Sequence, residues 1–395
     1  MASKESRLEL IQKLQDSFGG QIITYVTCDR PNLTWQIGQD QVRWLYEQIL
    51  SVVGSARKVK KLILFLHSRG GDSTVPWSVV NMIREYCDEF DVIVPFRAHS
   101  AATAISLGAD RIFMGPKGEL SPIDVRLGDK VAVEDVRGYI RLIREKASIT
   151  DQHEVASLFK VVAEKLPDPL VLGHVDRMLA QTRYAATGLL KARKKGRKMD
   201  EAQIERVVKA LTSEIAQHEH TISRREAKQL GLPVEFPSPE QEDLMWRLYR
   251  EYEAAMDLQK PFFPLAFMPP DCPDTYQIKD ITLAFLESTQ RTFRCLGTQT
   301  VSVVRQMPAN LNVQLNFALP PAAAAPGGMN QEQLQAMLRQ LHQFAVQQLQ
   351  AEMRKLPVME TKVAWTFVDW AEMQGDAAGT QNQAGIDPGA RSAPA

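Results

Sequence analysis

The feature that most constrains the fold is an alternation of strand-like and helix-like segments through the first 125 or so residues. Short apolar runs, bounded by charged residues or glycine, predict buried strands at 21–28, 60–67, 91–96 and 111–116. Segments between these runs show helical spacing of apolar residues, for example at 39–53 and 74–86. Strands that alternate with helices form a parallel sheet covered by helices, so the sequence predicts an α/β fold.

Length and composition set wider limits on the chain. Its 395 residues predict two or more domains, and a hydrophobic content of 44% allows a sizeable core. The formal net charge is zero, so we expect no nucleic-acid partner. No apolar run approaches the roughly 20 residues of a membrane-spanning helix, and the N-terminus lacks a signal-peptide core. Four widely spaced cysteines without a C-x-x-C pair fit a reducing compartment. We therefore expect a soluble, cytoplasmic protein with no membrane span.

The character of the sequence changes beyond about residue 240. A capping box formed by Ser223 and Glu226 predicts a short helix before a proline-rich boundary. We expect a core domain at 1–235, a helix and strand extension at 236–320, a linker at 321–328, a Gln-rich helix with a short strand at 329–372, and a disordered tail at 373–395. The apolar stripe of the Gln-rich helix fits either a coiled-coil seam or packing on its own domain.

The first segment that could take part in catalysis is HSRGGD, residues 67–72, which directly follows a predicted buried strand. Two adjacent glycines, Gly70 and Gly71, allow the backbone to approach a ligand closely. Their N–H groups could then face the negative charge that develops on a carbonyl oxygen during acyl transfer. A plain strand-to-helix turn is the alternative reading of this segment.

The second segment is AHSAAT, residues 98–103, which also follows a predicted strand. Ser100 would lie at a strand-to-helix turn, where a serine is well placed for nucleophilic attack. Small neighbouring residues leave room for a substrate. The alternative reading is a serine that only caps the following helix.

Taken together, the two segments resemble the Clp/crotonase superfamily, which includes the Clp protease proteolytic subunit and signal peptide peptidase A. The stretch 98–124, together with 168–190 and 220–235, is similar to the serine dehydrogenase proteinase family, a Clp-like family; the resemblance covers about residues 10–235. It implies a Clp/crotonase-like spiral of parallel strands and helices, with a mixed α+β region added at the C-terminal end. It also implies that Ser100 is the nucleophile, and that Gly70, Gly71 and the Ala101 amide form the oxyanion site.

The general base departs from the Clp pattern, because residues 115–128 contain no histidine where the Clp protease has one. That stretch offers Ser121 and Asp124 instead. Signal peptide peptidase A uses a lysine from a later segment, which makes Lys146 our candidate base, with Lys130 as an alternative. Asp124 would either orient the base or cap its own loop.

Other polar clusters are weaker candidates. The histidines at 67, 99, 153 and 174 are more typical of structural positions, and the pair at 218 and 220 lacks a third metal ligand. We expect the basic run KARKKGRK, residues 191–198, to be a solvated helix end, although such a run can also contact an acidic partner or nucleic acid.

The sequence therefore predicts a serine endopeptidase that acts on proteins or peptides through Ser100 with a lysine base. No cofactor and no metal are expected, and there is no phosphate-binding G-x-x-x-x-G-K-[ST] loop. The family resemblance implies a homo-oligomer, a trimer or a hexamer. Two alternatives remain open: an inactive Clp-like scaffold or peptide-binding module, and a crotonase-like acyl-CoA enzyme.

Overall fold

The structure is a computed structural model of the full chain. It describes residues 3–123, 126–127, 131–132, 142, 145, 151–165, 171–195, 199–214, 220–271, 273–306 and 330–373. The chain divides into two compact units. The first unit comprises Met1–Phe262, Thr282–Leu296 and Trp370–Ala377, and the second comprises Phe263–Ile281, Gly297–Asp369 and Ala378–Ala395.

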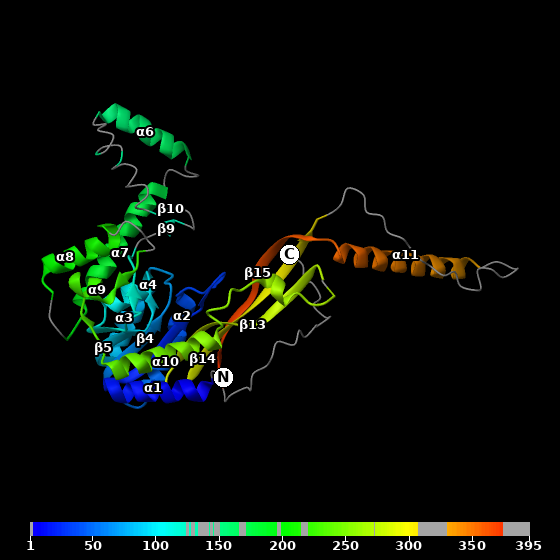
Figure 1. Ribbon diagram of the computed structural model, residues 1–395. Helices are drawn as coiled ribbons and strands as arrows, with labels where there is room; N and C mark the ends of the chain where they lie inside the picture. Colours follow the sequence, from blue (N-terminus) through cyan, green and yellow to red (C-terminus); the bar gives the residue numbers. More distant parts are fainter. Residues whose placement is uncertain are drawn as a thin grey trace. The chain divides into compact units, whose positions relative to one another are not determined.

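An eight-stranded sheet with the order β12-β7-β5-β4-β1-β13-β14-β15 organises the first unit (Figure 1). Its parallel part consists of β1 (Gln21–Thr27), β4 (Val59–His67), β5 (Cys87–Val94), β7 (Arg111–Met114) and β12 (Val234–Glu235). These strands coincide with the apolar runs of the sequence, so the predicted α/β fold with parallel strands and helices is confirmed. The last six residues of β4, from Leu62 to His67, are all buried, as a strand covered on both faces requires.

Three further strands make the sheet mixed. They are β13 (Thr275–Glu287), which pairs antiparallel with β1, followed by β14 (Thr292–Arg305) and β15 (Val358–Glu372). Each of the three contributes residues to both units. The sheet of the core is thus completed by residues well beyond 235.

Helices cover both faces of this sheet (Figure 1). On one face lie α1 (Lys4–Phe18) and α10 (Pro239–Ala255), and on the other lie α2 (Gln39–Val53), α3 (Val75–Tyr86) and α4 (Ala101–Leu107), followed by α7 (Val171–Lys191). Tyr252 connects α10 directly to the sheet, because its hydroxyl lies at hydrogen-bond distance, 2.7 Å, from Oγ1 of Thr24 in β1. Helix α10 therefore belongs to the core although it follows the proline-rich boundary.

Smaller elements complete the described part of the first unit. The helices are α6 (Gln152–Lys165), α8 (Glu201–Lys209) and α9 (Arg224–Gln229), and a short π-helix spans Ala210–Glu214. The short strands are β2 (Asp29–Arg30), β3 (Leu33–Thr34), β6 (Arg97–Ala98), β8 (Glu119–Leu120), β9 (Arg126–Leu127), β10 (Val131–Ala132) and β11 (Ile222–Ser223).

The predicted capping box of α9 is half formed. Oγ of Ser223 accepts a hydrogen bond from the Glu226 amide, as the pattern requires. The Glu226 carboxylate, however, lies 2.8 Å from Nε2 of His220. The side chain that would have completed the box therefore binds this histidine instead.

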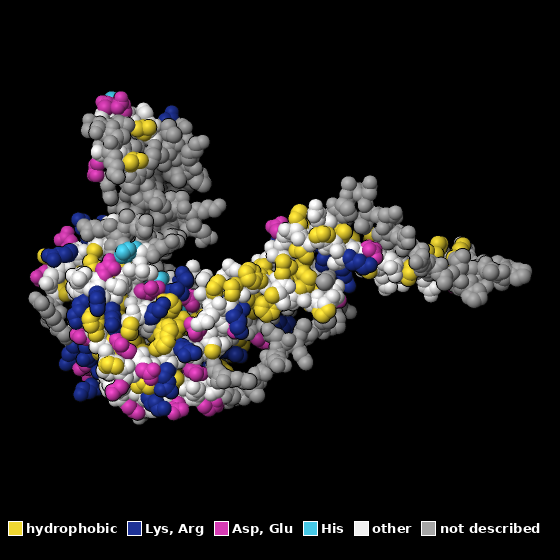
Figure 2. Space-filling model, viewed as in Figure 1, with side chains coloured by type: hydrophobic (Ala, Val, Ile, Leu, Met, Phe, Trp, Pro, Cys, Tyr) yellow, Lys and Arg dark blue, Asp and Glu magenta, His cyan; other side chains and the backbone are white. Residues whose placement is uncertain are grey.

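The described part of the second unit holds the 3-10 turn Pro264–Phe267, the helix α11 (Gln331–Arg354) and much of β13, β14 and β15. Helix α11 begins with a full capping box between Asn330 and Gln333, and none of its side chains is buried. Figure 2 shows apolar side chains gathered on the surface of this part of the chain. The largest exposed ones on β15 are Met359, Val363, Trp365, Phe367 and Val368.

Several sequence expectations fall outside the described residues. They are the strand-like segment 310–319, the linker 321–328 and the tail beyond 373, and the domain boundaries stay predictions. Within the described residues, no helix combines the length and apolarity needed to cross a membrane.

Candidate active site

The candidate site lies where the ends of β4 and β6 run side by side. Ser68, just after β4, forms a parallel bridge with Ala98 at the end of β6. The Ser68 amide donates to the Arg97 carbonyl at 2.9 Å, and the His99 amide donates to the Ser68 carbonyl at 3.0 Å. This pairing brings together the two segments that the sequence singled out.

Both glycines of the loop are required by close backbone contacts. Gly70 has a φ of +102°, and a Cβ there would lie 2.7 Å from Cβ of Ser100 and 2.8 Å from the His99 carbonyl oxygen. A Cβ at Gly71, where φ is +153°, would collide with the backbone of Ile37. The loop can therefore rest against the Ser100 turn only because Gly70 lacks a side chain, and against the Ile37 backbone only because Gly71 lacks one.

Ser100 adopts a strained conformation. Its φ of 49° and ψ of −112° lie in a region that non-glycine residues rarely occupy, and it immediately precedes α4. Strain of this kind costs on the order of 1–3 kcal/mol and persists only where surrounding contacts hold it. In α/β-hydrolases, a serine on a sharp, strained strand-to-helix turn exposes its hydroxyl at the top of the sheet. Ser100 is partly exposed.

Backbone amides near Ser100 differ in their partners. The Gly70 amide donates to Oγ of Ser68 at 3.1 Å, so it is already engaged. Neither the Gly71 amide nor the Ala101 amide donates to any residue that the structure describes. Two amides thus remain available next to the serine, which is the number that a typical oxyanion site uses.

A network of charged side chains flanks both loops. Buried Asp29 lies 3.2 Å from Nε2 of His67 and 2.6 Å from Nη1 of Arg97. Nε of Arg97 lies 3.1 Å from Oε1 of Glu119, and the same carboxylate oxygen lies 3.2 Å from Nε2 of His99. Burial raises the pKa of Asp29, but the contacts with His67 and Arg97 outweigh it and hold that pKa well below its usual range. Nε2 of each histidine therefore lies beside a carboxylate of this network, at Asp29 for His67 and at Glu119 for His99.

Comparison with known proteins assigns the family. The sequence matches the family described as ClpP-like SDH-type serine proteinase over residues 2–279. That match spans well over half of the 395 residues. The chain belongs to this family. The resemblance found in the sequence is confirmed, and the match continues beyond residue 235 through α10 and into β13.

Three known proteins show how far the likeness of this chain to others extends. Two relatives from Methanocaldococcus jannaschii, MJ0137 and MJ1495, are both described as uncharacterized proteins. MJ0137 is 26% identical over 256 residues, which cover 62% of this chain and 79% of the relative. MJ1495 is 23% identical over 205 residues, or 51% of this chain and 62% of the relative. The structure of ClpP1 from Listeria monocytogenes aligns with 58% of this chain and 95% of its own, at 15% identity and a TM-score of 0.32.

The residues predicted as the general base and its orienting group fall outside the described part of the chain. Asp124 and Lys146 are both among the residues that the structure leaves undescribed, as is the alternative Lys130. Of the predicted site residues, the structure therefore brings together Ser100, Ala101 and the two glycines only. Where it describes the chain, it contains no group of three His, Cys, Asp or Glu side chains that could hold a metal ion.

Sequence reasoning missed the residues that hold the two loops of the candidate site. Ser68 is fully buried, and its Oγ accepts from both Oγ1 of Thr27, at 2.8 Å, and the Gly70 amide. Asp29 lies far from these loops in the sequence, and nothing nearby marks it as their partner. Ser68 had one available signal, since a hydroxyl two residues before a glycine often bonds to the backbone of its own turn.

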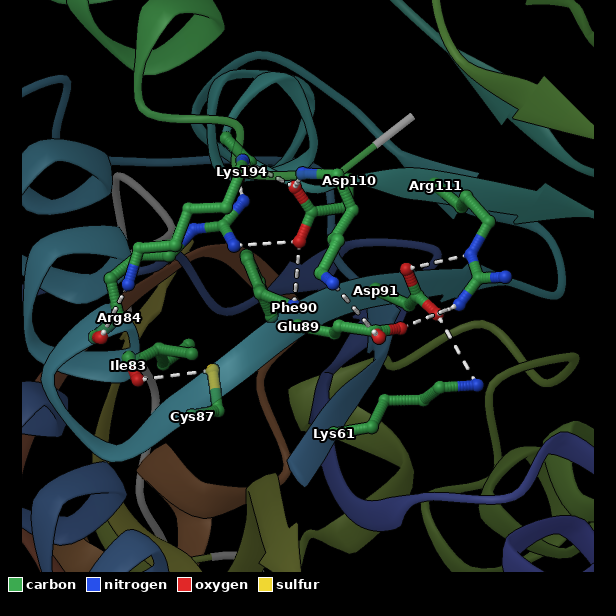
Figure 3. A network of polar contacts seen from close by, with 12 residues as sticks. Lys61, Ile83, Arg84, Cys87, Glu89, Phe90, Asp91, Asp110, Arg111 and Lys194 are labelled. Carbon is green, nitrogen blue, oxygen red and sulfur yellow. Dashed lines mark hydrogen bonds and ion pairs between the residues drawn. The ribbon is translucent and has the colours of Figure 1, made fainter. Parts of the chain in front are cut away.

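The described part of the basic run, residues 191–195, is anchored to the core rather than fully solvated (Figure 3). Oδ1 of Asp110 accepts hydrogen bonds from the amides of Lys194 and Lys195, at 2.7 and 2.8 Å. Its Oδ2 accepts from Arg84 at 2.6 Å and from the Phe90 amide at 2.9 Å. The side chains of Lys194 and Lys195 themselves are exposed. The run therefore has a structural attachment that its composition alone did not indicate.

Proposed function

We propose that this member of the ClpP-like family hydrolyses peptide bonds through an acyl-enzyme on Ser100. The observation that carries the proposal is the strained Ser100 turn, which packs against Gly70 and has two available amides beside it. Such strain costs stability and concentrates at active sites, which supports a catalytic role for this turn. Membership of a serine proteinase family supports the same function.

The proposed reaction follows from this arrangement. Oγ of Ser100 attacks the carbonyl carbon of the scissile peptide bond while its proton passes to a general base. The oxygen of the tetrahedral intermediate accepts hydrogen bonds from the Gly71 and Ala101 amides. The C–N bond then breaks, the amine leaves with the proton from the base, and water hydrolyses the serine ester to release the acid. No metal or nucleotide is needed for these steps.

We propose Lys146 as the base and Asp124 as the group that orients it. The histidines of the two loops, His67 and His99, have their Nε2 atoms 3.2 Å from the carboxylates of Asp29 and Glu119. A lysine acts as a base only if its pKa is lowered by burial or by nearby cations, and Ser-Lys pairs do so in other serine hydrolases. The substrate would be a protein or peptide, and the active form a homo-oligomer, either a trimer or a hexamer.

Hydrolysis of a fluorescent casein or a quenched-fluorescent peptide library tests the proposal. We expect Ser100→Ala to abolish turnover, while Ser106→Ala, a matched change to a buried serine of the same helix, leaves it near wild type. Oγ of Ser106 donates only to the Ala102 carbonyl, one helical turn earlier. Lys146→Ala and Asp124→Asn should lower turnover by about 100-fold or more if these residues supply the base. Turnover that survives Ser100→Ala would contradict the proposal.

A further inference from the structure

Ser121 has an unusual place beside the nucleophile. It follows β8, its residue is 2% exposed, and its Oγ accepts a hydrogen bond from the Ser100 amide at 2.8 Å. The same oxygen donates its only hydrogen to the Pro122 carbonyl at 2.9 Å. Because that hydrogen is committed, a lone pair of Oγ is left to face the Ser100 amide.

Thr103 fixes Ser121 from the other side. Its fully buried hydroxyl accepts from the Ser121 amide at 3.0 Å and donates to the Ala98 carbonyl at 2.6 Å. The two hydroxyls thus tie the segment after β8 to the backbone on both sides of the strained turn. The bonds run from the Ala98 carbonyl through Thr103 and Ser121 to the Ser100 amide.

We propose that Ser121 is a positioning residue, which holds the backbone of Ser100 in its strained conformation, and that Thr103 holds Ser121 in place. The inference rests on the proposed function of Ser100 as the nucleophile. A φ of 49° at a serine persists only while its surroundings enforce it, and the Ser100 amide would lose its acceptor without Ser121. Ser121 also engages the Ser100 amide, which leaves the oxyanion to the Gly71 and Ala101 amides.

The rate of covalent labelling by a fluorophosphonate probe measures this role. Ser121→Ala should label roughly 10- to 100-fold more slowly than wild type, because a shift of about 1 Å in the nucleophile has an effect of that size. Thr103→Val, which keeps the shape of the side chain but removes the hydroxyl, should slow labelling in the same way. Thr103→Ser, which restores the hydroxyl, should recover most of the rate. Ser106→Ala serves as the control for loss of a buried hydroxyl.

The pH dependence of labelling separates positioning from proton transfer. A positioning residue lowers the rate by the same factor throughout roughly pH 6 to 9, and leaves the shape of the profile unchanged. If the rise or fall of the labelling rate with pH disappears in Ser121→Ala, Ser121 takes part in proton transfer, and the inference is overturned. Labelling of Ser121→Ala at the wild-type rate would overturn it as well.

Hydrogen exchange at the Ser100 amide tests the contact without relying on activity. Ser121→Ala should accelerate exchange of this amide by about tenfold or more relative to Ser106→Ala, since its acceptor is gone. Unchanged exchange would overturn the inference whether or not the protein labels. A wild-type protein that does not label, yet shows faster exchange in Ser121→Ala, would refute the proposed function while supporting the contact.

Discussion

Gly70→Ala offers a quantitative test of how closely the glycine loop approaches the nucleophile. The added Cβ would stand 2.7 Å from Cβ of Ser100 and 2.8 Å from the His99 carbonyl oxygen, so the two loops must move apart. Alanine at a φ of +102° also costs about 1–3 kcal/mol, and overpacking adds about 1–3 kcal/mol more. We expect Gly70→Ala to lower the free energy of unfolding by about 2–6 kcal/mol and to slow fluorophosphonate labelling by about 100-fold.

Gly231→Ala is the matched control for this experiment. Gly231 has a similar φ of +98°, but a Cβ there would meet nothing within 4 Å. Gly231→Ala should therefore lower the free energy of unfolding only by the backbone strain of about 1–3 kcal/mol, and it should label at the wild-type rate. Urea unfolding and labelling kinetics of the two variants would be compared. Equal labelling rates for Gly70→Ala and Gly231→Ala would refute the packing of this loop against Ser100.

Three further predictions concern the polar network of the core. Glu287→Gln should lower the free energy of unfolding by about 3–5 kcal/mol in urea titrations, because it leaves Arg7 buried without its anionic partner at 2.8 Å; a loss below about 1 kcal/mol would contradict this. The pKa of Asp29 is depressed, so its carboxylate stabilises the fold above the unfolded pKa of about 3.9, and this stabilisation disappears as pH falls through the depressed value. Wild-type stability should therefore fall more steeply than that of Asp29→Asn below about pH 4, and parallel curves would count against the network. Asp110→Asn should speed tryptic cleavage after Lys194 by about tenfold, since the Lys195 amide of the cleaved bond loses a charged acceptor; unchanged cleavage would show that Asp110 does not anchor Lys194 and Lys195.

Sequence patterns located the parallel part of the fold because its strands are short apolar runs. The segment that became β4 reads as buried from Leu62 onward, and the structure buries each of those residues. The final layer of the core was not predictable in this way. Strand β13 and helix α10 follow a proline-rich boundary, and their pairing with β1 and α1 depends on contacts between residues more than 200 positions apart.

The candidate site shows a similar division. Ser100 and the two glycines stood out because strand-to-turn positions make their residue types informative. The strain at Ser100, the engaged amide of Gly70 and the contact with Ser121 are properties of backbone geometry, which residue types do not encode. Sequence therefore singled out the groups that we propose to react, and the structure shows the groups that hold them in place.

Fluorophosphonate labelling followed by peptide mapping tests the central claim most directly. We predict one covalent adduct per chain, on the peptide that contains Ser100, and its loss in Ser100→Ala. The probe phosphonylates only a serine whose hydroxyl is activated, so this adduct would establish the nucleophile without knowledge of the substrate. A folded wild-type protein that acquires no adduct, or an adduct that persists in Ser100→Ala, would contradict the claim and favour an inactive scaffold.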